Sequence, residues 1–130
     1  MENPAHLYRT ILPVPNIERA AQFYGALFGV PGQRVSPGRH YFDCGGVILA
    51  CYEPVADGDG GQAGWRFHPF QYLYFAVADL EAMLERAVAA GAVIEQAIQS
   101  MPWGERLFYC RDPFDSGICF VDAATKFTGV

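Results

Sequence analysis

The stretch LPVPNIE, Leu12–Glu18, recurs 63 residues later as FAVADLE, Phe75–Glu81. In each copy a strand-like run leads into Asn16 or Asp79, whose side chains can accept hydrogen bonds from the free N–H groups of a first helical turn. Apolar residues then continue at the i, i+3, i+4, i+7 spacing of a helix that buries one face. The repeat therefore predicts two modules of the same kind.

Each predicted helix ends at a glycine, Gly29 or Gly91, which readily takes the left-handed conformation of a C-cap. Strand-like runs follow each helix, and we expect these strands at residues 33–36, 40–43, 47–53, 93–99, 106–110 and 117–121. The chain then reads as an α+β protein made of two tandem βαβββ modules. We expect one domain over residues 1–130, with module one at 6–54, a Gly-rich linker at 55–70 and module two at 71–124.

Composition excludes several classes of protein. The chain has 130 residues, nine Lys and Arg against fourteen Asp and Glu, and a net charge of −5. Without a basic patch, nucleic acid is not an expected partner. No apolar run is long enough to span a membrane, and the start is not typical of a signal peptide. Cys44, Cys51, Cys110 and Cys119 form no CxxC pair, so we expect reduced thiols in a cytoplasmic protein.

Three segments carry a family resemblance. LPVPNIERAAQFYGALFGV, FAVADLEAMLERAVAAGA and RDPFDSGICFVD resemble the two modules of the vicinal oxygen chelate superfamily, which includes glyoxalase I, extradiol dioxygenases and bleomycin-resistance proteins. The resemblance implies a partly closed, eight-stranded mixed sheet that forms a cup, with the helices outside. In the metal-dependent members, His, Glu or Gln side chains from the first and last strands of each module hold a divalent ion.

The resemblance places those four ligand positions at Arg9, Leu49, Tyr72 and Cys119. Arg stays protonated and repels a cation, Leu cannot coordinate, and a neutral Tyr is a poor ligand. One thiolate does not complete a zinc site, which needs three or four protein ligands. We therefore expect no metal and no other cofactor.

The three histidines do not change this expectation. His6, His40 and His68 show no recognisable ligand spacing, and we interpret them as loop or surface residues. A site with such non-standard ligands stays open as an alternative.

Strand alternation indicates which side chains line the predicted cup. These candidate ligand-binding residues are Arg9, Ile11, Leu49, Cys51, Tyr72, Tyr74, Cys119 and Val121, with Trp103 near the mouth. Arg9 is free to meet a ligand or to pair with Glu53 or Asp122. Trp65, Phe67 and Trp103 either cover the mouth or anchor their loops. Cys119 would need a nearby base or cation to act as a nucleophile, and no matched position supplies a base.

The leading hypothesis is a metal-free protein that binds a small, largely apolar or aromatic molecule, as the bleomycin-resistance branch does. An anionic or carbonyl group on that ligand would meet Arg9. The alternative is a metal-dependent lyase, isomerase or dioxygenase of the same superfamily, and a third possibility is an interaction module with a filled cup. The sequence leaves catalysis undecided, and its exposed sheet edges make a homodimer plausible.

Overall fold

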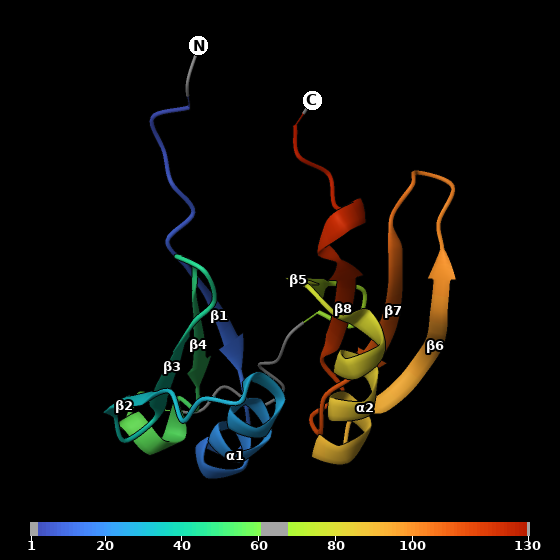
Figure 1. The fold of residues 1–130 in the computed structure, drawn as a ribbon. Coiled ribbons are helices and arrows are strands. Elements are labelled where there is room, and N and C mark those ends of the chain that lie inside the picture. The colour runs from blue at the N-terminus through green and yellow to red at the C-terminus, as the bar shows by residue number, and fades with distance from the viewer. Residues whose placement is uncertain (1–2, 61–67, 130) are drawn as a thin grey trace. The chain divides into compact units, whose positions relative to one another are not determined.

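The computed structural model describes residues 3–60 and 68–129 (Figure 1). The chain divides into two compact units, residues 1–67 and residues 68–130. We call these units module 1 and module 2, and each is described by itself.

Module 1 contains one helix and one four-stranded sheet. Its elements are β1 (Arg9–Pro13), α1 (Ile17–Phe28), β2 (Gln33–Ser36), β3 (Arg39–Asp43), β4 (Ile48–Tyr52) and the short 3-10 helix η1 (Val55–Asp57). The strands lie in the order β1-β4-β3-β2. β1 runs parallel to β4, and the other neighbours are antiparallel.

Module 2 repeats this arrangement. Its elements are β5 (Tyr72–Val77), α2 (Leu80–Ala90), β6 (Val93–Ser100), β7 (Arg106–Arg111), β8 (Gly117–Asp122) and the 3-10 helix η2 (Ala123–Thr125). The strand order is β5-β8-β7-β6, with β5 parallel to β8. The predicted α+β class and the two tandem βαβββ modules are confirmed. Among the described residues, hydrogen bonds join the strands in two four-stranded sheets and not in one eight-stranded sheet.

The helix ends follow the predicted capping chemistry. Asn16 accepts a hydrogen bond from the Arg19 backbone N–H, and Asp79 accepts one from the Ala82 N–H, each at 3.0 Å. Gly29 has φ of 71° and closes α1 in the left-handed conformation, while Gly91 closes α2 with φ of 101°. Both helices therefore begin and end where the sequence predicts.

The core of each module lies between its helix and one face of its sheet. In module 1 the Phe42 ring of β3 contacts Tyr24 and Phe28 of α1, with ring centroids 6.4 and 5.4 Å apart. In module 2 the rings of Phe75, Phe108 and Phe120 pack together on one face of the sheet. These apolar faces exclude water and supply most of the favourable free energy of folding.

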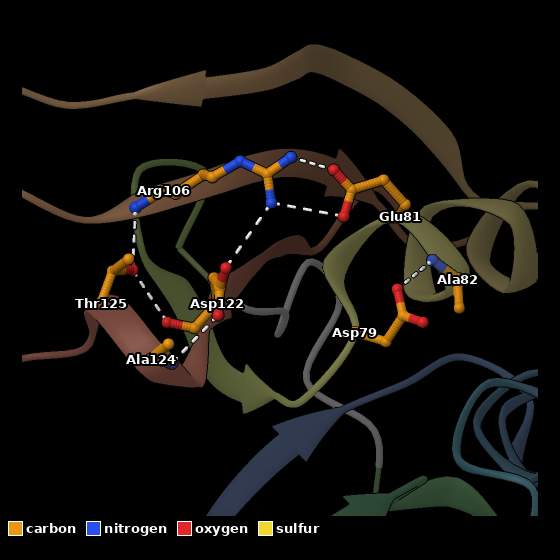
Figure 2. A network of polar contacts seen from close by, with 7 residues as sticks. All are labelled: Asp79, Glu81, Ala82, Arg106, Asp122, Ala124 and Thr125. Carbon is orange, nitrogen blue, oxygen red and sulfur yellow. Dashed lines mark hydrogen bonds and ion pairs between the residues drawn. The ribbon is translucent and has the colours of Figure 1, made fainter.

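A polar network ties α2 to the last strands of module 2 (Figure 2). Arg106 of β7 bonds the Glu81 carboxylate in the first turn of α2, and its guanidinium lies 3.5 Å from Asp122. The Arg106 backbone N–H donates to the Thr125 hydroxyl at 3.0 Å. Because Arg106 and Phe108 share a face of β7, this network also shows which face α2 covers.

The first described residues after β4 are bonded to module 1. The buried carboxylate of Asp57 accepts hydrogen bonds from Ser36 at 2.8 Å, from the Gly38 N–H at 2.6 Å and from Arg39 at 2.6 Å. Burial alone would raise the pKa of Asp57, but these three donors lower it below its ordinary value. The Tyr52 hydroxyl also bonds Asp59. The expected linker at 55–70 therefore starts with residues that are fixed to β2 and β3.

The helices of the described residues are all too short or too polar to cross a membrane. All four cysteines are free, as the sequence predicts for reduced thiols.

Candidate functional site

The sheet of module 2 has one face opposite α2, on which the side chains fall into rows across the strands. Cα partners place Tyr72, Gly117 and Arg111 in a first row and Tyr74, Cys119 and Tyr109 in a second. A third row contains Ala76, Val121 and Leu107. We call these nine residues the aromatic face. It contains every residue that the sequence assigns to the cup from β5 and β8.

In the first row Tyr72 and Arg111 contact each other across Gly117. Tyr72 and Arg111 come from strands on either side of β8, and Gly117 of β8 lies between them. A Cβ atom at Gly117 would lie 2.7 Å from Cδ2 of Tyr72, so only glycine leaves room for this ring. Across that gap the Arg111 guanidinium carbon lies 4.9 Å from the centre of the Tyr72 ring. Such a placement is a cation–π contact.

Glu95 of β6 completes this contact. The Tyr72 hydroxyl donates to the Glu95 carboxylate, and Arg111 donates to the same carboxylate at 2.9 Å and to the Tyr72 hydroxyl at 2.7 Å. The Tyr72 hydrogen bond and Arg111 hold the pKa of Glu95 below its usual value, against the effect of burial. Burial and the Glu95 carboxylate raise the pKa of Tyr72. The phenol stays neutral and the pair of charges is internally compensated.

The second row carries two phenols with few polar contacts. Tyr74 is 56% exposed and Tyr109 is half-buried, and their hydroxyl oxygens lie 3.5 Å apart. The Tyr109 ring stands nearly perpendicular to both Tyr72 and Tyr74, at centroid distances of 5.3 and 6.4 Å. Edge-to-face packing of this kind orders aromatic rings without using their hydroxyl groups. Burial raises the pKa of Tyr109, so its hydroxyl remains a donor at neutral pH.

Cys119 lies between Tyr74 and Tyr109 in the second row and belongs to a small apolar cluster. It is fully buried with Leu107 and Val121, and Met101 and Tyr109 pack against the three. Burial, with a smaller effect from the Glu105 carboxylate, raises the pKa of the Cys119 thiol to about 12. The neutral thiol that follows is a poor nucleophile and a poor metal ligand.

Module 1 presents Arg9 on the face of its sheet opposite α1. The Arg9 guanidinium donates to the Tyr41 hydroxyl at 3.0 Å and lies 5.2 Å from the Tyr8 ring centre. Within the described residues, no carboxylate forms an ion pair with Arg9. Glu53 instead accepts from the Ile17 N–H, so one of the two acids suggested as partners for Arg9 is engaged elsewhere.

The register of β4 corrects the predicted lining of module 1. Arg9 pairs with Ile48 and Ile11 pairs with Ala50, so these four side chains share a face. Leu49 and Cys51 point to the other face, where they lie buried on the side of the sheet that α1 covers. The expectation that they face the same side as Arg9 is wrong by one residue. The residue of β4 that corresponds to Cys119 is therefore Ala50, since Ile11 corresponds to Tyr74 in the repeat.

Trp103 lies outside the strands of module 2. Trp103 is 60% exposed in the turn between β6 and β7, and its indole N–H donates to Glu105 at 2.8 Å. Trp65 and Phe67 lie outside the described residues. Whether any of these side chains covers a ligand stays a prediction.

The donor set at the four ligand positions does not fit a divalent metal ion. With the corrected register the positions are Arg9, Ala50, Tyr72 and Cys119, which offer a cation, a methyl group, an engaged phenol and a neutral thiol. Across residues 3–60 and 68–129, no group of three or more His, Cys, Asp or Glu side chains is arranged to hold a metal.

The histidines are engaged locally. Nδ1 of His40 accepts from Arg34 at 3.2 Å, and its other ring nitrogen therefore donates to the Pro31 carbonyl at 2.8 Å. His68 accepts from the Phe70 N–H at 3.1 Å. His6 is exposed. His40 is thus part of the core of module 1, whereas the sequence suggests a loop or surface position for it.

The sequence did not predict three side chains that contribute to this face of module 2: Glu95, Tyr109 and Arg111. The alternation in RLFYCR predicts that Leu107, Tyr109 and Arg111 share a face, so Tyr109 and Arg111 could have been predicted from the sequence. Glu95 lies where the register of β6 against β7 shifts, and alternation fails at such irregularities.

Comparisons with known proteins agree with this arrangement. The family model of the "Glyoxalase/Bleomycin resistance protein/Dioxygenase superfamily" matches residues 6–120. None of the curated proteins compared matches the chain.

Several solved structures share the fold. A glyoxalase-related enzyme from Fulvimarina pelagi has a TM-score of 0.72 at 22% identity, over 90% of this chain and 87% of that one. TioX from Micromonospora sp. ML1 has a TM-score of 0.70 at 23% identity, over 92% and 99% of the two chains. A glyoxalase/bleomycin resistance protein/dioxygenase family enzyme from Burkholderia phytofirmans PsJN has a TM-score of 0.72 at 20% identity, over 92% and 99%. At these identities the likeness shows the fold alone.

Proposed function

Because the chain belongs to the Glyoxalase/Bleomycin resistance protein/Dioxygenase superfamily, we propose that it binds a small, largely apolar or aromatic molecule on the aromatic face, without a metal ion. One observation carries the proposal: exposed Tyr74 stands beside half-buried Tyr109 above an apolar cluster. Rings held at fixed angles over an apolar base suit the flat surface of an aromatic ligand.

The polar edge of the aromatic face supports the same proposal. Arg111 and Glu95 compensate each other, and Tyr72 is held between them. These groups are already bonded, so a ligand that covers the second row leaves no new charge unpaired. Burial of a charge without a partner would cost several kcal/mol, on the order of the whole affinity of a weak ligand.

Module 1 adds a second candidate contact. Arg9 is a cation without a carboxylate partner among the described residues, and it is flanked by Tyr8 and Tyr41. An anionic or carbonyl group is the chemistry that such a guanidinium binds. The proposal therefore includes Arg9 as a separate contact of module 1 for an anionic or carbonyl group.

The metal-free part of the proposal is tested on purified protein by elemental analysis. We expect no stoichiometric divalent ion, because the residues at the four ligand positions are not suitable donors. A stoichiometric ion that EDTA removes would overturn this part and favour the metal-dependent lyase, isomerase or dioxygenase. Turnover of a thiohemiacetal or a catechol that depends on added Ni, Fe, Mn or Zn would do the same.

The binding part is tested by equilibrium dialysis of naphthalene against the protein. Tyr74→Ala should weaken binding, because it removes the exposed ring of the aromatic face. Val88→Ala is the matched control, since Val88 is also 56% exposed in module 2 but lies on α2. Equal affinities of the two variants, or no binding to the unchanged protein, would contradict the proposal.

We also propose that the protein is cytoplasmic and forms a homodimer. Its four free thiols support the first statement, because disulfides are rare in reducing compartments. The second statement is supported by β1, β2, β5 and β6, which lie at the edges of the two sheets among the described residues, because an edge strand can pair its backbone groups with another chain. Sedimentation equilibrium checks the dimer, and a monomer across the micromolar range would refute it.

A further inference from the structure

Tyr74 and Tyr109 form a pair of hydroxyl groups that do not satisfy each other, and we call them the tyrosine pair. Their oxygens are 3.5 Å apart, whereas O–H···O hydrogen bonds usually measure about 2.5–3.0 Å. Neither hydroxyl has another hydrogen-bond partner within the described residues. Two phenols carry two O–H donors, and one contact between them uses at most one. At least one donor therefore remains for a ligand.

The neighbouring polar groups of the aromatic face are already in use. Each guanidinium nitrogen of Arg111 has an acceptor: Glu95 at 2.9 Å, the Tyr72 hydroxyl at 2.7 Å, and the carbonyls of Pro69 and Asp115 at 3.1 Å. The Tyr72 hydroxyl donates to Glu95. Among the described side chains of the aromatic face, the tyrosine pair is thus where new hydrogen bonds can form.

The surroundings of the tyrosine pair disfavour a negative charge. The base of the second row is apolar, formed by Leu107, Cys119 and Val121. The Glu105 carboxylate acts on Cys119 from nearby, adding to the effect of burial on that thiol. The one guanidinium of the aromatic face is compensated by Glu95. An ionised group placed here would lose water without gaining a cation, which is costly.

We propose that the tyrosine pair selects ligands with a neutral hydrogen-bond acceptor, such as a ketone or amide carbonyl, over ligands with a carboxylate. Both phenols would donate to a single oxygen about 2.8 Å from each, which its two lone pairs allow. The raised pKa of Tyr109 supports this role, because the donor stays protonated across the neutral range. The inference rests on the proposed function and adds a specificity to the same face.

Three ligands that differ in one group test the inference: naphthalene, 2-acetylnaphthalene and 2-naphthoate, each measured by equilibrium dialysis. A net hydrogen bond of about 1 kcal/mol corresponds to about fivefold in affinity. We expect 2-acetylnaphthalene to bind about five- to tenfold tighter than naphthalene. Tyr74→Phe and Tyr109→Phe keep the rings, so each should reduce this ratio severalfold and leave the affinity for naphthalene unchanged.

Two further variants make the result specific. Tyr52→Phe in module 1 is the matched control, because it removes a phenol hydroxyl outside the aromatic face and should leave the ratio unchanged. Arg9→Gln removes the cation of module 1, so 2-naphthoate that still binds reports on the aromatic face. In this variant we expect 2-naphthoate to bind more weakly than 2-acetylnaphthalene.

The outcomes separate the two proposals. If naphthalene binds but 2-acetylnaphthalene gains nothing over it, the selectivity is refuted and the proposed function stands. The same holds if the double variant Tyr74→Phe/Tyr109→Phe keeps the preference for 2-acetylnaphthalene, or if 2-naphthoate binds tightest in Arg9→Gln. If none of the three compounds binds, the proposed function fails and the inference fails with it.

Discussion

Gly117→Ala is expected to destabilise module 2 through a collision with a single side chain. The added Cβ would lie 2.7 Å from Cδ2, 2.8 Å from Cε2 and 2.9 Å from Cγ of Tyr72, all closer than ordinary carbon contacts. Cγ is the root of the ring, so the ring cannot move aside by bending at its tip. Tyr72 would have to leave its place between Arg111 and Glu95.

Three effects determine the change in the free energy of unfolding: two destabilise the variant and one stabilises it. Overpacking costs about 1–3 kcal/mol, and loss of the edge-to-face contact with Tyr109 costs about 0.5–1.5 kcal/mol. Alanine also restricts the unfolded chain, which stabilises the fold by about 0.4–1 kcal/mol, since Gly117 does not have the positive φ that would strain alanine. The free energy of unfolding should fall by about 2 kcal/mol, within a range of about 0.5–4 kcal/mol.

A double-mutant cycle isolates the collision. Urea unfolding followed by circular dichroism gives the free energy of unfolding for Gly117→Ala, Tyr72→Ala and the double variant. In the Tyr72→Ala background the new methyl group meets no ring, so Gly117→Ala should become neutral or stabilising by about 0.5 kcal/mol. A coupling energy near zero, or a stabilised single variant, would refute the reasoning.

Three more outcomes follow from contacts within single modules. The Tyr72 hydroxyl and Arg111 lower the pKa of Glu95 from its usual 4.5. The ionised Glu95 carboxylate therefore stabilises the fold above pH 4.5, and this contribution is lost as the pH falls through the lowered pKa. Stability measured against pH should fall less steeply below about pH 4.5 in Glu95→Gln than in the unchanged protein. The Cys119 thiol, with a pKa of about 12, should resist iodoacetamide at pH 8 until urea unfolds the protein, and rapid labelling in the native state, read by mass spectrometry, would argue against its burial. Gly32→Ala should lower the melting temperature by several degrees, because Gly32 has φ of 65° and a Cβ there would lie 2.6 Å from the Phe42 ring; an unchanged melting temperature would contradict this.

The caps, the helices and the order of strands could be predicted because local chemistry determines them. Asn16 and Asp79 accept from the first helical turn, and Gly29 and Gly91 take the left-handed conformation, whatever lies around them. The internal repeat then predicted the order of helix and strands in both modules, because the two modules have the same arrangement. Most predicted strand ends lie within one residue of the observed ones.

The phase of β4 could not be predicted in the same way. VILACY, residues 47–52, is apolar at every position, so alternation gives no signal for which residues face α1. Alignment on the repeat then placed Leu49 opposite Cys119, whereas the parallel pairing of β1 with β4 makes Ala50 the equivalent residue. A shift of one residue moves every side chain of a strand to the other face.

The contact of Tyr72, Arg111 and Glu95 was beyond sequence reasoning for a different reason. Tyr72 and Arg111 belong to strands that are not neighbours, and they meet because Gly117 leaves a gap in the strand between them. A glycine at the start of a strand is common, and nothing local marks this one as a passage for a ring.

The hydrogen bonds of Asp57 and Asp59 to module 1 determine where the chain can be cut, or a domain inserted, without loss of structure. By composition the first module ends near residue 54, and a chain cut there would leave Arg39 and the Gly38 N–H without their carboxylate. A cut after Asp59 retains every one of these bonds, including that of Tyr52. Insertion of a foreign domain should therefore be tolerated after residue 59 and should disrupt the β2–β3 hairpin when placed five residues earlier.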